Sequence, residues 1–451
     1  MRKIILPAFL SFVALCCAAQ SFTILGQGNN AIYYNSYIFG LAPDGLGNIY
    51  AGCGNTTTGT GFGFVEKWNG TNWSALPLIT DSAYCGDVRA IAADTANNLY
   101  IGGDFNDLGT TQLGGFYVAN WNGSAWSELE NAGHPHFNNA SLLAITCSAG
   151  NVYATQYLDT LTGPVFYYVA KWDGTNWTEP GAGTQPLHVD SVILALAHDH
   201  LGNIYAGGQF GDSTGKKYVA KFNGTTWSNL GNLDANANIL SLAADGAGNV
   251  YAGGIFTDLA GKTYVAKWDG NTWSDLGNSA SALGYGYIAS LATDPGGNVY
   301  AAGYLKDSTG FFVAKWNGSS WYKLYTDTFQ FSVIATDAQS NVYGARQGRF
   351  YIGQPAYGFV ARLNFATTAV ENITDEVLQV KLYPNPANDL LHISSDTKFE
   401  YTEMYTMLGQ MVLKAEGSQR TLDISELAKG IYIAKLQSAS GKTVIAKFCK
   451  E

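Results

Sequence analysis

The sequence predicts an all-β protein that is built mainly as a seven-bladed β-propeller, with a smaller β-domain at its C-terminal end. One unit recurs seven times, and an anchor tyrosine follows Asn and an aliphatic residue in every copy, at intervals of 43 to 53 residues. No copy shows a helical period, and turn residues divide each copy into four short apolar segments. Repeats of this length form propellers or solenoids. The anchor tyrosines are Tyr50, Tyr100, Tyr153, Tyr205, Tyr251, Tyr300 and Tyr343.

The four strands are clearest in the copy that spans Ile193 to Gly231. Its first strand is the apolar run that ends at Asp199, and its second follows an Asp-His-Leu-Gly-Asn turn, in which Asp can accept hydrogen bonds from its own turn. The third strand reads Tyr-Val-Ala-Lys-Phe, and the fourth begins after Asn-Gly, a strong hairpin signal. Four strands in about 40 to 50 residues is typical of a propeller blade.

The two ends of the repeat region complement each other. Six copies complete their fourth strand with a tryptophan, whereas the seventh stops near Phe365. The segment Ser21 to Gly26 matches the fourth strand Thr226 to Gly231, with Phe in place of Trp. We therefore expect the N-terminal strand to complete the last blade and to close the ring. The tryptophans are Trp73, Trp126, Trp177, Trp227, Trp273 and Trp321, and we interpret them as packing residues.

The N-terminal residues 1–19 have the pattern of a secretory signal peptide. Arg2 and Lys3 precede an apolar run, and small residues then form a cleavage site near Gln20. The run is too short for a membrane-spanning helix. We therefore divide the chain into a signal peptide (1–19), a propeller (20–365), a linker (366–376) and a C-terminal domain (377–451).

Three motifs follow in series in the C-terminal domain. They are Leu382 to Ala387 with the core Tyr383, Pro384, Asn385 and Pro386; Met404 to Val412 with Gly409; and Leu427 to Tyr432 with Gly430. In this order they resemble the type A C-terminal sorting domain of type IX secretion cargo from Bacteroidetes. The resemblance implies a small Ig-like β-sandwich, recognition by the secretion machinery, and transfer through the periplasm to the cell surface or the medium. An Ig-like module with a binding task of its own is the alternative.

The repeat itself resembles bacterial propeller repeats of the pattern Asp-x-x-Gly-Asn-(Ile/Val)-Tyr, which are related in outline to the kelch and NHL groups. This resemblance covers Ser21 to Phe365 and implies a fold alone, because such rings host lyases, oxidases and binders. The net charge of −10 argues against nucleic acid, whose binding requires a basic surface.

The candidate binding residues come from the links between blades. These links differ in length and chemistry from copy to copy and share one face of the ring, here called the link face, while the Asp turns share the opposite face, here called the turn face. Variable loops on a rigid scaffold commonly carry function. Amides, carboxylates and tyrosines there suit sugar hydroxyls and rings, although the same residues are ordinary loop formers. The candidates are Asn35, Tyr37, Asp87, Arg89, Asn138, Asp190, Asn236, Asn238, Tyr285, Tyr287 and Gln330.

No cofactor is expected. His134, His136 and His188 lie in neighbouring links and offer a weak metal-site candidate, since their spacing is not that of a helix-borne zinc motif. The favoured function is non-catalytic binding of a glycan or surface ligand. One alternative is a polysaccharide-degrading enzyme that uses Asp87 and Asp190 as its carboxylate pair, and another is a scaffold for a protein partner.

Four cysteines remain after removal of the signal peptide. Cys53 ends the second strand of the first copy, and Cys85 lies in the link that enters the second copy. Because the export route is oxidising, a disulfide between Cys53 and Cys85 is a candidate. Cys147 replaces the turn aspartate that the other six copies have, and we expect a buried thiol there.

Overall fold

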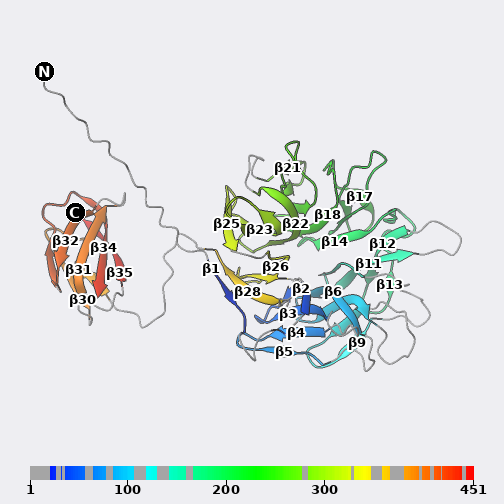
Figure 1. Cartoon of the computed structure of the whole chain (residues 1–451), viewed down its shortest axis with the longest axis horizontal. Helices are drawn as coiled ribbons and strands as arrows, with labels where there is room; N and C mark the ends of the chain where they lie inside the picture. The colour runs from blue at the N-terminus through cyan, green and yellow to red at the C-terminus, as the bar shows by residue number, and fades with distance from the viewer. Residues whose placement is uncertain are drawn as a thin grey trace, which may run out of the picture. The chain divides into compact units, whose positions relative to one another are not determined.

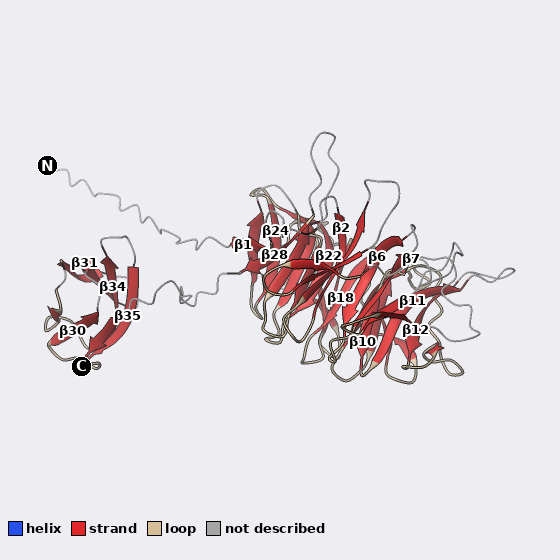
Figure 2. Cartoon of the chain, turned by 90° about the horizontal axis from the view of Figure 1, so that it is seen from below, coloured by secondary structure: helices blue, strands red, loops and turns tan. Residues whose placement is uncertain are grey.

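The computed structural model divides the chain into two compact units, Met1–Ala366 and Thr367–Glu451. The signal peptide and the linker predicted from the sequence lie outside the described residues. The structure describes residues 21–26, 32, 36–55, 64–77, 85–105, 118–129, 142–158, 166–276, 283–326, 330–346, 358–365, 380–395, 399–406, 411–417, 419–438 and 443–451. Within these residues every regular element is a β-strand (Figure 2).

The first unit contains seven four-stranded antiparallel sheets among its described residues. Six of them use consecutive strands. The first three are β2 (Ser36–Pro43), β3 (Ile49–Asn55), β4 (Phe64–Trp68) and β5 (Trp73–Ala75); β6 (Cys85–Ala93), β7 (Leu99–Phe105), β8 (Val118–Trp121) and β9 (Trp126–Glu128); and β10 (Ile145–Ser148), β11 (Asn151–Leu158), β12 (Phe166–Trp172) and β13 (Trp177–Thr178). The next three are β14 (Ile193–His198), β15 (Ile204–Gly208), β16 (Ala220–Phe222) and β17 (Trp227–Asn229); β18 (Ile239–Ala244), β19 (Val250–Gly254), β20 (Ala266–Trp268) and β21 (Trp273–Asp275); and β22 (Tyr285–Thr293), β23 (Val299–Lys306), β24 (Phe311–Trp316) and β25 (Trp321–Thr326).

The seventh sheet combines the two ends of the repeat region. Its order is β1-β28-β27-β26, with β26 (Val333–Thr336), β27 (Val342–Arg346), β28 (Phe359–Asn364) and the N-terminal β1 (Ser21–Ile24). β1 runs antiparallel to β28, and Ser21 pairs with Asn364. β26 contacts both β22 of the sixth sheet and β2 of the first. Figure 1 shows the sheets arranged about a common centre, with the first strand of each sheet toward the middle.

The repeated tryptophan of the fourth strand joins neighbouring sheets. Trp227 Nε1 donates to the Pro180 carbonyl at 3.1 Å, and Trp321 Nε1 donates to the Leu276 carbonyl at 2.9 Å. In the first sheet, Trp73 Nε1 donates to Leu25 O at 2.8 Å, which follows directly after β1. The N-terminal segment therefore occupies the position that a fourth strand has in the other repeats. The tryptophans are packing residues that also satisfy a carbonyl of the preceding repeat.

In six of the seven described turns, the repeated Asp, Asn and Tyr form one hydrogen-bond network; the third turn has Cys147 in place of the aspartate. In the fourth sheet, Asp199 Oδ1 accepts from the Leu201 and Asn203 amides at 3.0 and 2.9 Å, and Oδ2 accepts from Asn203 Nδ2 and Tyr205 Oη at 2.7 and 2.8 Å. Burial alone would raise the pKa of Asp199, but these hydrogen bonds favour the carboxylate and lower it. The spacing Asp-x-x-x-Asn-x-Tyr is thus the sequence of a capped turn.

The second unit is a two-sheet sandwich. One sheet has the order β29 (Val380–Tyr383), β30 (Leu390–Ser395) and β33 (Thr421–Asp423); the other has the order β32 (Met411–Glu416), β31 (Phe399–Thr406), β34 (Gly430–Ser438) and β35 (Thr443–Lys450). Leu391 from the first sheet and Met404 and Phe448 from the second share one buried core. Apolar residues from both sheets therefore meet between them, as in β-sandwiches.

Candidate functional site

The described candidates of the link face lie together at one end of the first strands. Asn35 and Asn138 lie outside the described residues. All the others lie in the first part of a first strand or shortly before it, at the end opposite the Asp turns. They are Tyr37 on β2, Asp87 and Arg89 on β6, Tyr285 and Tyr287 on β22, and Asp190, Asn236, Asn238 and Gln330 before β14, β18 and β26.

A mixed aromatic and charged cluster joins the first and second sheets. Arg89 Nη2 lies 3.2 Å from Asp87 Oδ2, and the guanidinium lies 5.5 Å from the centre of the Phe39 ring. The Tyr37 ring stacks beside Phe39 at 6.2 Å. A Cβ added at Gly54 would lie 1.9 Å from Asp87 Oδ1, so this glycine leaves the space that the carboxylate fills.

An aromatic platform lies on the sixth sheet. Tyr287 pairs with Tyr304 across β22 and β23, and their rings stack with centres 6.0 Å apart. Phe311 meets the edge of Tyr304 at 5.3 Å, and Tyr285 lies beside Tyr287 on the same side of the sheet. Tyr285 is 66% exposed and Tyr304 is 38% exposed, so the platform has a solvent-facing surface. We call Tyr285, Tyr287, Tyr304 and Phe311 the tyrosine platform.

The backbone of β22 is shaped to support this platform. Gly286 has φ of 138°, and a Cβ at that position would lie 1.6 Å from the Tyr304 carbonyl oxygen. Only glycine permits so close an approach of the two strands. The sequence alone indicates Tyr285 and Tyr287 but misses Tyr304 and Phe311, since these follow an ordinary strand motif and reach the link face only because β23 is long. The one signal in the sequence is that Tyr304, an aromatic residue, directly follows two small residues in the second strand of its copy.

The histidine candidates have other partners or lie outside the described residues. His134 and His136 are outside them. His188 Nε2 lies 2.6 Å from Glu179 Oε1, and its ring stacks on Phe166 at 5.3 Å. Asp190 is exposed and raises the pKa of Tyr218 after the larger effect of burial. Across the described ranges, no group of three or more His, Cys, Asp or Glu side chains could hold a metal ion.

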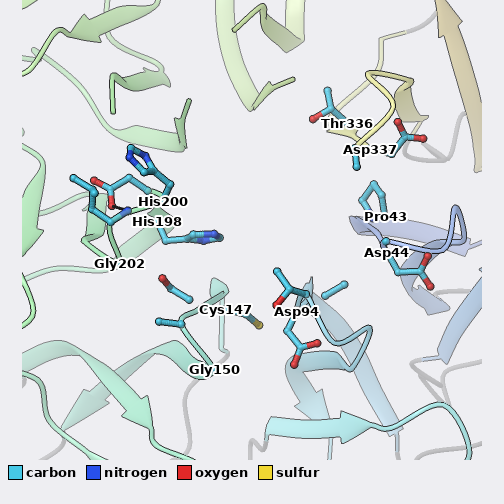
Figure 3. A pocket seen from close by; sticks show the side chains of 18 residues that line it. Pro43, Asp44, Asp94, Cys147, Gly150, His198, His200, Gly202, Thr336 and Asp337 are labelled. Carbon is cyan, nitrogen blue, oxygen red and sulfur yellow. Dashed lines mark hydrogen bonds between the residues drawn. The ribbon is translucent and has the colours of Figure 1, made fainter. Parts of the chain in front are cut away.

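The turn face carries a cavity of about 460 Å³ (Figure 3). It is lined by the first turns of the first, second, third, fourth and seventh sheets. The carboxylates of Asp44, Asp94 and Asp337 point away from it, toward their own turns, which agrees with a capping role. The sequence does not indicate this cavity, because the turn face repeats with little change, and its departures toward reactive side chains include Cys147 in the third sheet and His198 in the fourth.

Those two sheets supply the unusual groups of the cavity. His198 directs its ring into it, and His198 Nδ1 lies 2.8 Å from Thr146 Oγ1 of the third sheet. Enclosure by protein lowers the pKa of His198, so its neutral form is favoured. Cys147 is buried, as expected, and burial raises its pKa. Its turn is a two-residue hairpin in which Ala149 and Gly150 have positive φ.

The predicted disulfide between Cys53 and Cys85 is wrong. Cys53 is a free, buried thiol. It packs with Ala51 and with Val360 of the seventh sheet, whereas Cys85 begins the second sheet, on the other side of the first. Side chains alternate along a strand, so Cys53 shares the direction of Ala51 and faces away from β6.

The motifs of the C-terminal unit hold its last strand. Cys449 N donates to Asn385 Oδ1 at 2.9 Å, and Ala387 N donates to the Cys449 carbonyl at 2.8 Å. Pro384 and Pro386 each follow a cis peptide bond. Tyr432 stacks on Phe448 at 5.6 Å and donates to the Ala428 carbonyl at 2.8 Å, and Gly430 begins β34. Tyr383 is exposed on β29, and Gly409 lies outside the described residues.

Comparison with known proteins assigns this unit. Residues 381–451 match the family of the secretion system C-terminal sorting domain. The chain therefore carries the domain that marks proteins for export by the type IX secretion system to the cell surface or the extracellular space, and it has the secretion machinery as a partner. Within the described part of the chain, no helix is long and apolar enough to cross a membrane.

Other similarities are partial. Over 69 residues the chain is 36% identical to beta-agarase D from Zobellia galactanivorans, a match that covers 15% of this chain and 14% of the agarase. The chain thus spans a small part of that relative. PorZ, a surface component of the type IX secretion system of Porphyromonas gingivalis, is similar in structure with a TM-score of 0.50 and 14% identity, over 92% of this chain and 59% of PorZ. At this identity the likeness is one of fold.

A further solved structure is the β-propeller domain of the Trilobed protease from Pyrococcus furiosus. Its TM-score is 0.47 at 8% identity, and the match covers 74% of this chain and 99% of that domain.

Removal of residues 377–451 is expected to prevent export of the protein from the cell, because the sorting domain that the secretion machinery recognises is lost. The truncated chain should accumulate in the periplasm. Immunoblots of periplasmic, surface and medium fractions from a type IX-competent host measure this, with the full chain as the control. Wild-type amounts of truncated protein in the medium would contradict the assignment.

Proposed function

We propose that this protein is a seven-bladed β-propeller of the Asp-x-x-Gly-Asn-(Ile/Val)-Tyr type that is exported by type IX secretion and binds glycans without catalysis through its link face. The pairing of β1 with β28 and the bond from Trp73 to Leu25 support a ring closed by the N-terminal strand. Successive contacts of the first strands, including β26 with β2, agree with this arrangement.

The tyrosine platform is the observation that carries glycan binding. An exposed tyrosine presents an apolar ring face and a hydroxyl, which suit the C–H face and the hydroxyl groups of a sugar ring. Tyr285 and Tyr304 are exposed, and Tyr287 and Phe311 brace Tyr304 from two directions. Bracing limits the side-chain entropy that is lost when a ligand binds. Such a rigid, exposed surface favours binding over packing as its role.

The Asp87 and Arg89 cluster supports the same proposal at a second position on the link face. Tyr37 and Phe39 lie beside the ion pair of this cluster. Aromatic rings and charged groups therefore lie together at this position. Because Asp87 already faces Arg89, its geometry is that of an ion pair, and a role in binding or packing suits it better than that of a free catalytic base.

Substituting Tyr285→Ala or Tyr304→Ala should weaken glycan binding about tenfold, since each removes a stacking surface. The mature full-length chain is incubated with a panel of insoluble polysaccharides, and retention and new reducing ends are measured together. Tyr322→Ala is the matched control, because Tyr322 is 43% exposed on β25, outside the platform.

Retention that falls in the platform variants and persists in the control would support the proposal. New reducing ends would overturn it in favour of a hydrolase. Absence of retention on every polysaccharide would also overturn it and favour a protein partner.

A further inference from the structure

The tyrosine platform lies on the side of the sixth sheet that faces the seventh. Tyr300 and Ala302 of β23 pack with Val342 and Ala361 of the seventh sheet in one buried cluster. Tyr304 and Lys306 continue the same alternation along β23 and so share this side. The platform thus borders the junction of the two sheets at the link face.

A cationic group accompanies the platform. Lys306 pairs with Tyr285 across the strands, and Lys306 Nζ lies 5.2 Å from the centre of the Phe311 ring. In the described part of the chain, no carboxylate lies within ion-pair distance of Lys306, in contrast to Lys323, which lies 2.8 Å from Asp307. The aromatic ring positions the ammonium while its charge stays available to a ligand.

The seventh sheet contributes a second cation at the same junction. Arg346 ends β27 and pairs with Phe359, and its guanidinium lies 5.9 Å from the centre of that ring. Phe359 packs against the buried cluster between the sixth and seventh sheets, so Arg346 shares the side that faces the platform. Burial lowers the pKa of Arg346, which means that the guanidinium is partly removed from water.

These two cations contrast with the net charge of the chain. The chain has 25 basic and 35 acidic residues, with a net charge of −10. A net negative charge disfavours the binding of an anionic chain in general, and the two cations at this junction favour its binding there. Stacking alone would not distinguish charged from neutral sugars, whereas Lys306 and Arg346 do.

We infer that the ligand of the tyrosine platform is an anionic polysaccharide, with sulfate or carboxylate groups held by Lys306 and Arg346 and sugar rings held by Tyr285 and Tyr304. This inference rests on the proposed glycan-binding function. Guanidinium and ammonium groups both donate charge-assisted hydrogen bonds to these anions, and the planar guanidinium can bind two oxygens at once.

The test compares three polysaccharides at several salt concentrations with the mature full-length chain. Agarose is neutral, carrageenan carries sulfate, and alginate carries carboxylate. Affinity for at least one anionic polymer is expected to exceed that for agarose about tenfold and to fall as salt rises. Lys306→Gln should lose most of this preference, while Lys221→Gln, which removes another lysine held over a tyrosine ring, should retain it.

The outcomes separate the two proposals. Equal binding of all three polymers that depends on Tyr285 but not on Lys306 would overturn the anionic ligand and leave the glycan-binding function standing. Binding of none would overturn both. A preference for carrageenan alone identifies sulfate, a preference for alginate alone identifies carboxylate, and either supports the inference. Thermal unfolding of Lys306→Gln that matches wild type excludes misfolding as the cause.

Discussion

Asp199→Ala is expected to lower the free energy of unfolding by about 3 kcal/mol or more, the largest loss we expect from a single turn residue. Asp199 is 4% exposed and accepts four hydrogen bonds within its turn. Truncation leaves the Leu201 and Asn203 amides, Asn203 Nδ2 and Tyr205 Oη without their acceptor. Tyr205 Oη is buried and the other three donors are partly buried, so their desolvation adds to the loss of the hydrogen bonds themselves.

Chemical denaturation of the mature chain, followed by tryptophan fluorescence, measures this loss. Tyr205→Phe removes a single donor of the same network and should cost only about 1 kcal/mol. Asp212→Ala is the matched control, because Asp212 caps an exposed turn of the same repeat and accepts from Thr214 and Lys216. A loss at Asp199 no greater than that at Asp212 would contradict the network's role in holding the sheet.

The repeated parts of this structure could be predicted from the sequence because short-range patterns determine them. The anchor tyrosine, the turn aspartate and the Asn-Gly hairpins each act within a few residues, so their order predicts four strands per copy. The partial seventh copy likewise predicts the pairing of the N-terminal strand, since an incomplete sheet needs a fourth strand.

The candidate site could be predicted only in part, because it depends on contacts between distant segments. Tyr285 and Tyr287 stand out in a variable link, but Tyr304 and Lys306 join them only through the pairing of β22 with β23. Cys53 is a second residue whose contacts could not be predicted from the sequence. Its position near a neighbouring repeat suggested a partner, yet the alternation of side chains along β3 directs it to the other side of the sheet.

The third strand of the first sheet contains the one repeat departure that we expect to control pH-dependent stability. Glu66 stands where the other six copies have a buried alanine, namely Ala119, Ala170, Ala220, Ala266, Ala314 and Ala361. Glu66 is 5% exposed, and burial raises the pKa of its carboxyl group to about 7. It faces the same interface as Cys53, whose pKa is raised by burial and, secondarily, by the charge of Glu66.

Glu66→Gln is therefore expected to stabilise the protein at pH 8 and to have little effect at pH 5. The folded-state pKa of Glu66 lies above the usual value near 4.3, so the folded chain binds more protons than the unfolded chain, and stability falls as pH rises through this range. The shift corresponds to a difference of about 3 to 4 kcal/mol at pH 8, when the buried carboxylate is ionised. Denaturation of wild type and variant at pH 5, 6.5 and 8 measures this difference in stability.

Glu66→Ala restores the residue of the other repeats and serves as a second variant. Its stability, like that of Glu66→Gln, should not depend on pH in this range. A constant offset between wild type and Glu66→Gln across the three pH values would mean that folding does not raise the pKa of Glu66.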